Sequence, residues 1–126
     1  MEDLTKYKMD SEEFIIDNVA CKIINAAKEK RKKVVAIGTT TAKTLESSVY
    51  LSGFVKADSN WTNKFIFPPY SFSVPDALVT NFHPSQSSMM MLVAAFAGYD
   101  LLMEAYQTAV KEKYRFLTYG DAMLII

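Results

Sequence analysis

One run of residues limits the fold of this chain more than any other. Four apolar residues, Val34 to Ile37, are followed at once by Gly38 and then by three threonines. A continuous apolar run of this length is typical of a strand buried on both faces, as in the parallel sheet of an α/β protein. Gly38 stops the strand, and Thr39 to Thr41 can cap a helix that continues to about Tyr50. The segment therefore predicts a strand-turn-helix unit of an α/β fold.

Length and composition restrict the class of protein. The 126 residues suffice for one domain with its own core, and we treat residues 1–126 as a single α/β unit. Lys and Arg number 14, as do Asp and Glu, so the chain as a whole has no charge that attracts nucleic acid or an anionic membrane. Cys21 is the only cysteine, which excludes a disulfide framework and suits a reducing compartment. With no signal peptide and no apolar run long enough to span a bilayer, the sequence predicts a cytoplasmic protein without a membrane partner.

The first third of the chain predicts an edge element and a helix. Residues 1–16 are expected to be a connecting segment or edge strand, with Phe14 to Ile16 as the strand part, and residues 17–126 the α/β core. Asp17 is a good N-cap for a helix to about residue 31. The apolar face expected for this helix consists of Val19, Ile23, Ile24 and Ala27.

The rest of the chain predicts further strands and helices around a small, largely parallel sheet. Residues 51–63 are polar enough to read as a long surface loop. An apolar helix starts at Ser87 or Ser88 and ends at Gly98, and Asp100 can cap an amphipathic helix after it. Strands are expected at 64–67, 76–82 and 123–126.

Two groups of polar residues could carry chemistry at the ends of these elements. The Gly38 turn offers free backbone N–H groups and the hydroxyls of Thr39 and Thr40, which suit a carboxylate or a phosphate, although helix capping explains them too. His83, close to Asn81, is the only histidine and has an ordinary pKa near neutrality, but a lone histidine often has a structural place. One histidine cannot make a metal site, so no metal is expected.

A third group lies near the end of the chain. Arg115 and Asp121 bracket an aromatic turn that contains Gly120. They could bind a nucleobase or a ribose by stacking and hydrogen bonding. An internal ion pair between the two explains the pattern equally well.

Five strings, taken in order and with their spacing, resemble the C-terminal part of the S-adenosylmethionine:tRNA ribosyltransferase-isomerase family of queuosine biosynthesis. They lie at residues 35–46, 65–70, 76–83, 92–98 and 114–124. The resemblance implies an enzyme that moves the ribosyl moiety of S-adenosylmethionine onto the aminomethyl-deazaguanine base of tRNA, giving epoxyqueuosine with loss of adenine and methionine. It implies no bound cofactor, because S-adenosylmethionine is consumed as the ribosyl donor.

The resemblance also implies that the chain is a fragment. Family members are longer, with an α/β domain interrupted by an inserted β-barrel, and this chain matches only the part after the insertion. We therefore expect the C-terminal half of a larger α/β domain, inactive without the remainder of the parent enzyme. His83 is the candidate catalytic residue, and the candidate substrate-binding residues are Gly38, Thr39, Thr40, Asn81, Arg115 and Asp121.

The chain departs from the family pattern at two places. The residues from Pro84 to Ser87 replace the usual Leu-Pro-Lys-Ser, which removes a basic residue from the His83 turn, and Lys43 replaces an arginine. Two other functions fit the sequence: a non-catalytic RNA-binding or assembly module, and a generic nucleotide-binding α/β domain. Binding of tRNA without turnover would indicate the module, and binding of free nucleotide but not tRNA would indicate the generic domain.

Overall fold

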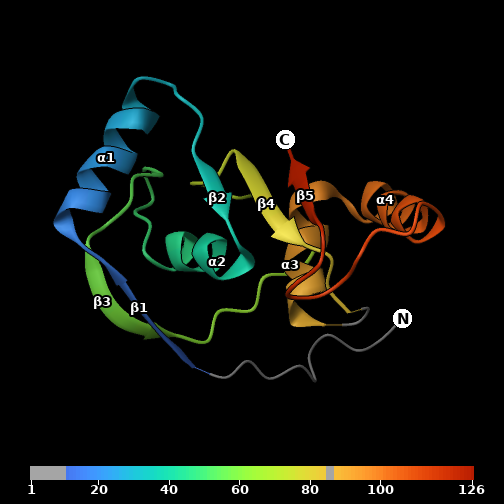
Figure 1. The fold of residues 1–126 in the computed structure, drawn as a ribbon. Helices are drawn as coiled ribbons and strands as arrows, with labels where there is room; N and C mark the ends of the chain where they lie inside the picture. Colours follow the sequence, from blue (N-terminus) through green and yellow to red (C-terminus); the bar gives the residue numbers. More distant parts are fainter. Residues whose placement is uncertain (1–10, 85–86) are drawn as a thin grey trace.

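A computed structural model describes residues 11–84 and 87–126, and the helices and strands of this part are shown in Figure 1. Strands β2 (Val35–Ile37), β4 (Ala77–Asn81) and β5 (Ala122–Ile125) form one sheet in that order. β2 and β4 are parallel, whereas β4 and β5 are antiparallel. The sheet is therefore mixed, and the expectation of a largely parallel sheet is wrong. Two helices together return the chain to the end of the sheet where β4 stops, so Ala122 pairs with Asn81 and β5 runs the other way.

A second, two-stranded sheet pairs β1 (Glu12–Ile16) with β3 (Asp58–Thr62) in antiparallel register. The expected strand at Phe14 to Ile16 is confirmed. The loop expected over residues 51–63 is wrong across β3, because the backbone of β1 orders a polar segment that has no apolar alternation. The strand expected at 64–67 is absent, and Ile66 enters the core from an irregular segment instead.

Helix α1 (Asn18–Glu29) follows the predicted cap, since the Asp17 carboxylate accepts a hydrogen bond of 2.7 Å from the Ala20 N–H. Ile24 and Ala27 pack on the core as expected, but Val19 and Ile23 are 68% and 66% exposed, so that part of the expected face is wrong. Asn25 fixes the rotation of the helix: its side chain accepts from the Val55 N–H at 2.7 Å and donates to the Val55 carbonyl at 2.9 Å. Ala20 and Cys21 take the places on the core that were expected for Val19 and Ile23.

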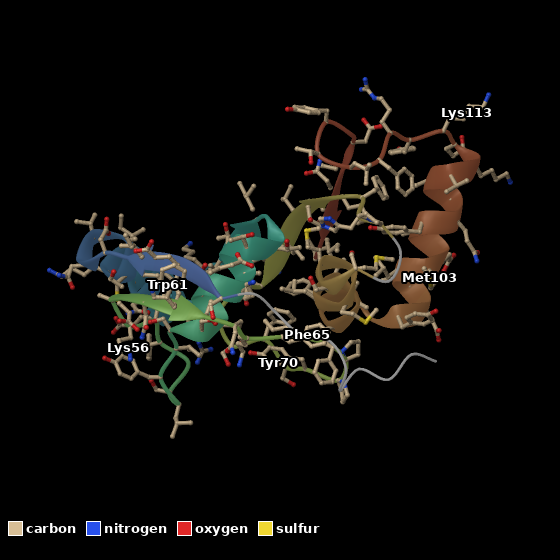
Figure 2. The ribbon with its side chains drawn as sticks, turned by 90° about the horizontal axis from the view of Figure 1, so that it is seen from below. Lys56, Trp61, Phe65, Tyr70, Met103 and Lys113 are labelled. Atoms are coloured by element: carbon tan, nitrogen blue, oxygen red, sulfur yellow. The ribbon has the colours of Figure 1, made fainter. Side chains whose placement is uncertain are left out.

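Three further helices cover one face of the three-stranded sheet: α2 (Thr39–Ser47), α3 (Ser88–Ala97) and α4 (Tyr99–Lys111). The Ser87 hydroxyl caps α3 by accepting from the Met90 N–H, as predicted. Asp100 does not cap α4; the cap is Gly98, and Asp100 lies in the first turn. Figure 2 shows Lys56 and Trp61 at one end of the molecule, Met103 and Lys113 on the α4 side, and Phe65 and Tyr70 between them.

The two faces of the three-stranded sheet differ sharply in exposure. The paired residues Ala36, Leu78 and Ile125 lie on the face that packs against the helices, and Ala36 and Leu78 are 1% and 0% exposed. The neighbouring residue on each strand belongs to a second row, and because side chains alternate along a strand, this row lies on the opposite face of the sheet. This row consists of Ile37, Val79 and Leu124, of which the first and last are 71% and 63% exposed.

Among the described residues, no single helix has the length and apolar composition to cross a bilayer. α3 and α4 meet these criteria only as a pair, and a bend of 114° separates them.

Candidate functional site

The carboxyl ends of β2 and β4 lie at the same edge of the sheet because the two strands are parallel. The turn after β2 begins with Gly38, whose N–H donates to the Val79 carbonyl at 2.7 Å. Gly38 has a φ of 96°, which only glycine adopts without strain. The turn after β4 carries His83. Two of the predicted groups of residues therefore follow neighbouring strands.

A cavity of about 240 Å³ lies at the start of α2. Thr39 and Thr40 from α2 and Ser88 and Met89 from α3 line it, so two helices begin at its wall. The other lining residues are Glu12, Lys43, Lys64, Phe65, Ile66 and Leu92. The structure thus brings the predicted Thr39 and Thr40 to a cavity with both charged and apolar walls.

The N-cap of α2 is Gly38, and no side chain caps the helix, so the expected cap at Thr39 to Thr41 is wrong; the helix also ends at Ser47, before Tyr50. Its first backbone N–H groups keep their partial positive charge for an anion. The Thr39 side chain lies in this first turn with the residue only 8% exposed. Its hydroxyl has no hydrogen-bond partner among the described residues. Every fully buried side-chain oxygen in that part of the chain does have a partner. The Thr39 hydroxyl is therefore not fully buried, and it keeps access to the cavity.

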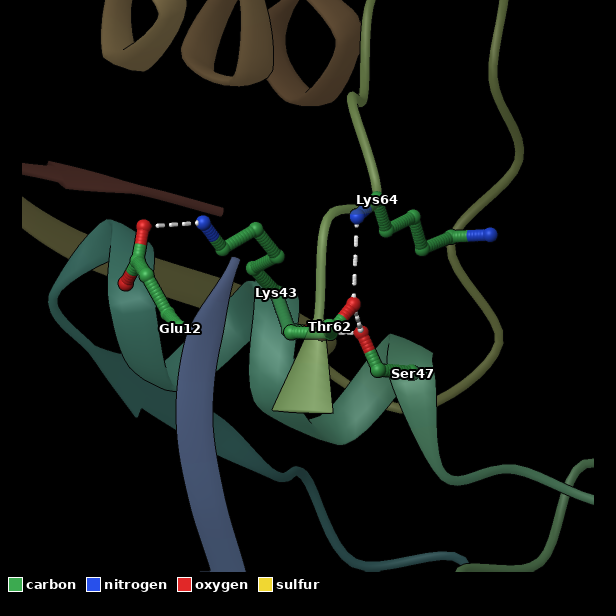
Figure 3. A network of polar contacts seen from close by, with 5 residues as sticks. All are labelled: Glu12, Lys43, Ser47, Thr62 and Lys64. Carbon is green, nitrogen blue, oxygen red and sulfur yellow. Dashed lines mark hydrogen bonds and ion pairs between the residues drawn. The ribbon is translucent and has the colours of Figure 1, made fainter. Parts of the chain in front are cut away.

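Polar contacts surround three residues of the cavity wall, Glu12, Lys43 and Lys64 (Figure 3). Lys43 is 6% exposed, and its ammonium contacts Glu12 Oε1 at 2.6 Å. Ser47 Oγ lies 2.9 Å from Thr62 Oγ1, which accepts from the Lys64 N–H at 3.1 Å. Glu12 neutralises Lys43, whereas the Lys64 ammonium lies 5.4 Å from the centre of the Tyr70 ring and has no acidic partner in the described chain.

His83 is held by two polar contacts. Its Nε2 lies 2.7 Å from Thr80 Oγ1, and its backbone N–H donates to the Tyr106 hydroxyl at 2.7 Å. Burial lowers the pKa of the imidazole below its ordinary value of 6.5, so the ring is neutral at neutral pH. A neutral imidazole that donates from Nε2 to Thr80 leaves its Nδ1 lone pair free to accept a proton.

Asn81, Arg115 and Asp121 form a separate group around the turn before β5. The Asp121 carboxylate accepts from the Arg115 N–H at 2.7 Å and forms an ion pair of 3.7 Å with its guanidinium. The Asn81 amide donates to the carbonyls of Gly120 and Asp121 at 3.4 and 3.3 Å. A Cβ on Gly120 would come within 2.5 Å of the Arg115 carbonyl, so the turn closes only with glycine there. The internal ion pair weighed from the sequence is therefore present.

The predicted site residues thus form more than one group. Thr39 and Thr40 line the cavity, but His83, Asn81, Arg115 and Asp121 do not. Sequence reasoning missed Glu12 and Lys64, which come to the cavity from segments far apart in the chain. Thr80 could have been found from its place three residues before His83, whereas nothing in the sequence signals Tyr106.

Glu46 is a further buried polar residue, outside the site predicted from the sequence. It is 4% exposed, and its carboxylate accepts hydrogen bonds from the Tyr70 hydroxyl at 2.8 Å, the Ser73 N–H at 3.0 Å and the Val74 N–H at 2.8 Å. Burial and the nearby carboxylate raise the pKa of Tyr70. Through these hydrogen bonds Glu46 fixes the segment that contains Tyr70. The Tyr70 ring in turn lies under the Lys64 ammonium. Across residues 11–84 and 87–126, no group of three or more His, Cys, Asp or Glu could hold a metal ion.

Comparison with known proteins gives consistent matches. A sequence model of the family described as queuosine biosynthesis protein matches residues 1–125. The chain is 58% identical over its whole length to the S-adenosylmethionine:tRNA ribosyltransferase-isomerase of Phocaeicola vulgatus, and 56% identical to that of Bacteroides fragilis. The crystal structure of S-adenosylmethionine tRNA ribosyltransferase from Thermotoga maritima superposes with a TM-score of 0.81 at 43% identity, covering 90% of this chain and 40% of that one. The chain spans 36% of the length of the curated relatives it matches.

Proposed function

Because the chain belongs to the family of queuosine biosynthesis proteins, we propose that it is the C-terminal part of an S-adenosylmethionine:tRNA ribosyltransferase-isomerase. The parent enzyme moves the ribosyl moiety of S-adenosylmethionine onto the aminomethyl-deazaguanine base of tRNA in the cytoplasm. The product is epoxyqueuosine, and adenine and methionine leave. S-adenosylmethionine is a substrate here and no cofactor is held. The observation that carries the proposal is the 58% identity along the entire chain to an enzyme of that name.

The exposed sheet face supports the view that the chain is half of a larger α/β domain. Ile37, Val79 and Leu124 form an apolar row on the face that the helices leave open. An α/β sheet is normally covered on both faces. Nearly two-thirds of the length of the relatives lies outside this chain, which spans 36% of them. We assign the cover of this face to the remainder of the same polypeptide, which would also carry the inserted β-barrel.

His83 is the candidate for proton transfer. The reaction requires removal of a proton from the carbon next to the sulfonium, and a general base must be unprotonated, which for a histidine means neutral, and held close to that carbon. Burial keeps the His83 imidazole neutral, and Thr80 and Tyr106 hold the ring and the backbone in place. The proposal gives His83 either the role of base or that of orienting the substrate.

Asn81, Arg115 and Asp121 are proposed to face the tRNA. Asp121 fixes the turn, while the Arg115 side chain remains 80% exposed and can stack on a nucleobase or donate to a ribose or phosphate. Gly38, Thr39 and Thr40 form the other proposed substrate contact. The chain carries no net charge, so contacts with tRNA depend on local residues such as Arg115.

Release of adenine tests the proposed function. The full-length protein that carries this chain should release adenine from S-adenosylmethionine only when tRNA with the aminomethyl-deazaguanine base is added. Unmodified tRNA serves as the control. Adenine release without tRNA would instead indicate a hydrolase, and tight tRNA binding with no adenine release would favour the RNA-binding module.

A further inference from the structure

We propose that the cavity at the start of α2 binds the amino-acid end of S-adenosylmethionine, with the α-carboxylate of the substrate at the N-terminus of α2. The inference rests on the proposed function, since it gives a place to a substrate named there. It goes further because it decides which of two anions binds at the Gly38 turn, the carboxylate of the substrate or a phosphate of the RNA.

The wall formed by α2 suits a carboxylate. The helix has no side-chain cap, and its first N–H groups are left for an outside acceptor. The Thr39 hydroxyl supports a ligand at this wall separately from the helix N-terminus. Thr39 is 8% exposed, lines the cavity and has no hydrogen-bond partner among the residues described. Because this hydroxyl is open to the cavity and no described protein group bonds to it, it can donate to a ligand there. Lys64 adds a positive charge without an acidic partner in the same set of residues.

The wall that contains Glu12 suits an ammonium group. Glu12 places one carboxylate oxygen on Lys43 at 2.6 Å, while its side chain is still 44% exposed. Its second oxygen has no partner among the described residues and can accept from an ammonium in the cavity. An α-amino acid carries both charges on neighbouring atoms, which matches a cavity with an anion-binding and a cation-binding wall.

The remaining walls are apolar and suit the methylene groups of a methionine. Met89, Leu92 and Ile66 line the cavity beside the charged residues. An RNA phosphate has no use for these apolar walls, and it has no proton to donate to the second Glu12 oxygen. The combination of charges and apolar surface therefore favours the amino-acid end of S-adenosylmethionine over the RNA backbone.

Isothermal titration of the full-length protein with three ligands tests the inference. S-adenosylmethionine has the whole amino-acid end, and decarboxylated S-adenosylmethionine lacks only the carboxylate. 5′-Methylthioadenosine lacks both the amino-acid end and the sulfonium charge. Thr39→Val removes the hydroxyl with little change in shape. Thr41→Val is the matched control, because Thr41 lies in the same helical turn and does not line the cavity.

Thr39→Val should weaken binding of S-adenosylmethionine by about 10- to 100-fold, the usual worth of a hydrogen bond to a charged group, and leave the other two ligands unchanged. Thr41→Val should leave all three unchanged. Wild-type protein should bind the decarboxylated ligand about 10- to 100-fold more weakly than S-adenosylmethionine, a comparison that needs no variant to fold.

Three results would overturn the inference: equal affinity of the wild type for S-adenosylmethionine and its decarboxylated form, normal binding of S-adenosylmethionine by Thr39→Val, or a loss confined to tRNA binding. If the wild type still converts tRNA in any of these cases, the proposed function stands and only the assignment of the cavity fails. If the wild type neither binds S-adenosylmethionine nor converts tRNA, both fail together.

Discussion

At the scale of single residues, Glu46 and Thr39 of α2 differ in their hydrogen bonds to the rest of the described chain. Glu46 accepts from three different residues and fixes the chain around Tyr70. Thr39 is similarly buried but has no partner in the described chain, and it lines a cavity. The Thr39 hydroxyl is open to that cavity, so it can form a hydrogen bond to a ligand there.

His83 is partly buried, and it should contribute more to turnover than to folding, because the one hydrogen bond of its ring within the described chain is that to Thr80. If it is the base, His83→Ala in the full-length protein should reduce the single-turnover rate by about two to four powers of ten. An orienting role predicts a smaller loss with an unchanged pH profile. Rates for His83→Ala and His83→Gln across pH separate the two roles, and wild-type rates in both variants would remove His83 from the site.

The lowered pKa of His83 also predicts how folding stability depends on pH. Below the unfolded-state pKa of 6.5, the unfolded chain takes up a proton that the folded chain does not, so the folded state loses stability as pH falls from that value toward the lower folded-state pKa. No other side chain type has an ordinary pKa in this window, and His83 is the only histidine.

The free energy of unfolding of the wild type should therefore decrease between about pH 7 and about pH 5, and that of His83→Gln should decrease less. Urea titrations at the two pH values measure the difference. Equal decreases in the two proteins would show that the folded state does not disfavour the charged imidazole.

At the scale of elements, two helices begin at glycines of nearly identical conformation. Gly38 precedes α2 with a φ of 96° and a ψ of 146°, and Gly98 precedes α4 with 91° and 138°. A Cβ would meet nothing closer than 3.9 Å at Gly38 and nothing within 4 Å at Gly98, so alanine is disfavoured by the backbone and not by crowding. Only the Gly38 turn lies beside the cavity.

Gly38→Ala and Gly98→Ala form a matched pair in the full-length protein. Each should lower the free energy of unfolding by about 1–3 kcal/mol through backbone strain. Only Gly38→Ala should also weaken binding of S-adenosylmethionine, measured by titration at a temperature where both variants are folded. Equal binding by the two variants would mean that the Gly38 turn has a structural role alone.

The elements also show what could be predicted from the sequence. The Val35–Ile37 strand, the caps at Asp17 and Ser87 and the helices after them depend on local signals, and all are confirmed. β3 and the rotation of α1 depend on partners far away in the chain, namely β1 and Val55. The same limit applies to the cavity: Thr39 and Thr40 are adjacent and were predicted, whereas Glu12 and Lys64 meet them only in the folded chain.

At the scale of the whole molecule, one face of the three-stranded sheet carries an apolar row that the described helices do not cover. Exposed apolar area of this kind marks an interaction surface. Since the chain spans 36% of its relatives, we assign this surface to the remainder of the parent protein. The assignment predicts that the same substitution has different effects in the isolated chain and in the full-length protein.

Ile37→Lys should change the stability of the isolated 126-residue chain by no more than about 0.5 kcal/mol, because Ile37 is 71% exposed there. In the full-length protein it should cost several kcal/mol, since burying an unpaired charge is expensive. Leu51→Lys, at a fully exposed residue outside the sheet, is the control and should be neutral in both. Thermal unfolding of the two proteins compares them, and an equally small effect in both would leave the sheet face without a partner.

The central claim is that this chain is part of an enzyme that makes epoxyqueuosine in tRNA. Mass spectrometry of nucleosides from tRNA treated with the full-length protein and S-adenosylmethionine tests it most directly. We predict conversion of the aminomethyl-deazaguanine nucleoside to epoxyqueuosine by the full-length protein, and none by the isolated chain. Unchanged tRNA after treatment with folded full-length protein would contradict the claim, and epoxyqueuosine made by the isolated chain would contradict its dependence on the remainder of the protein.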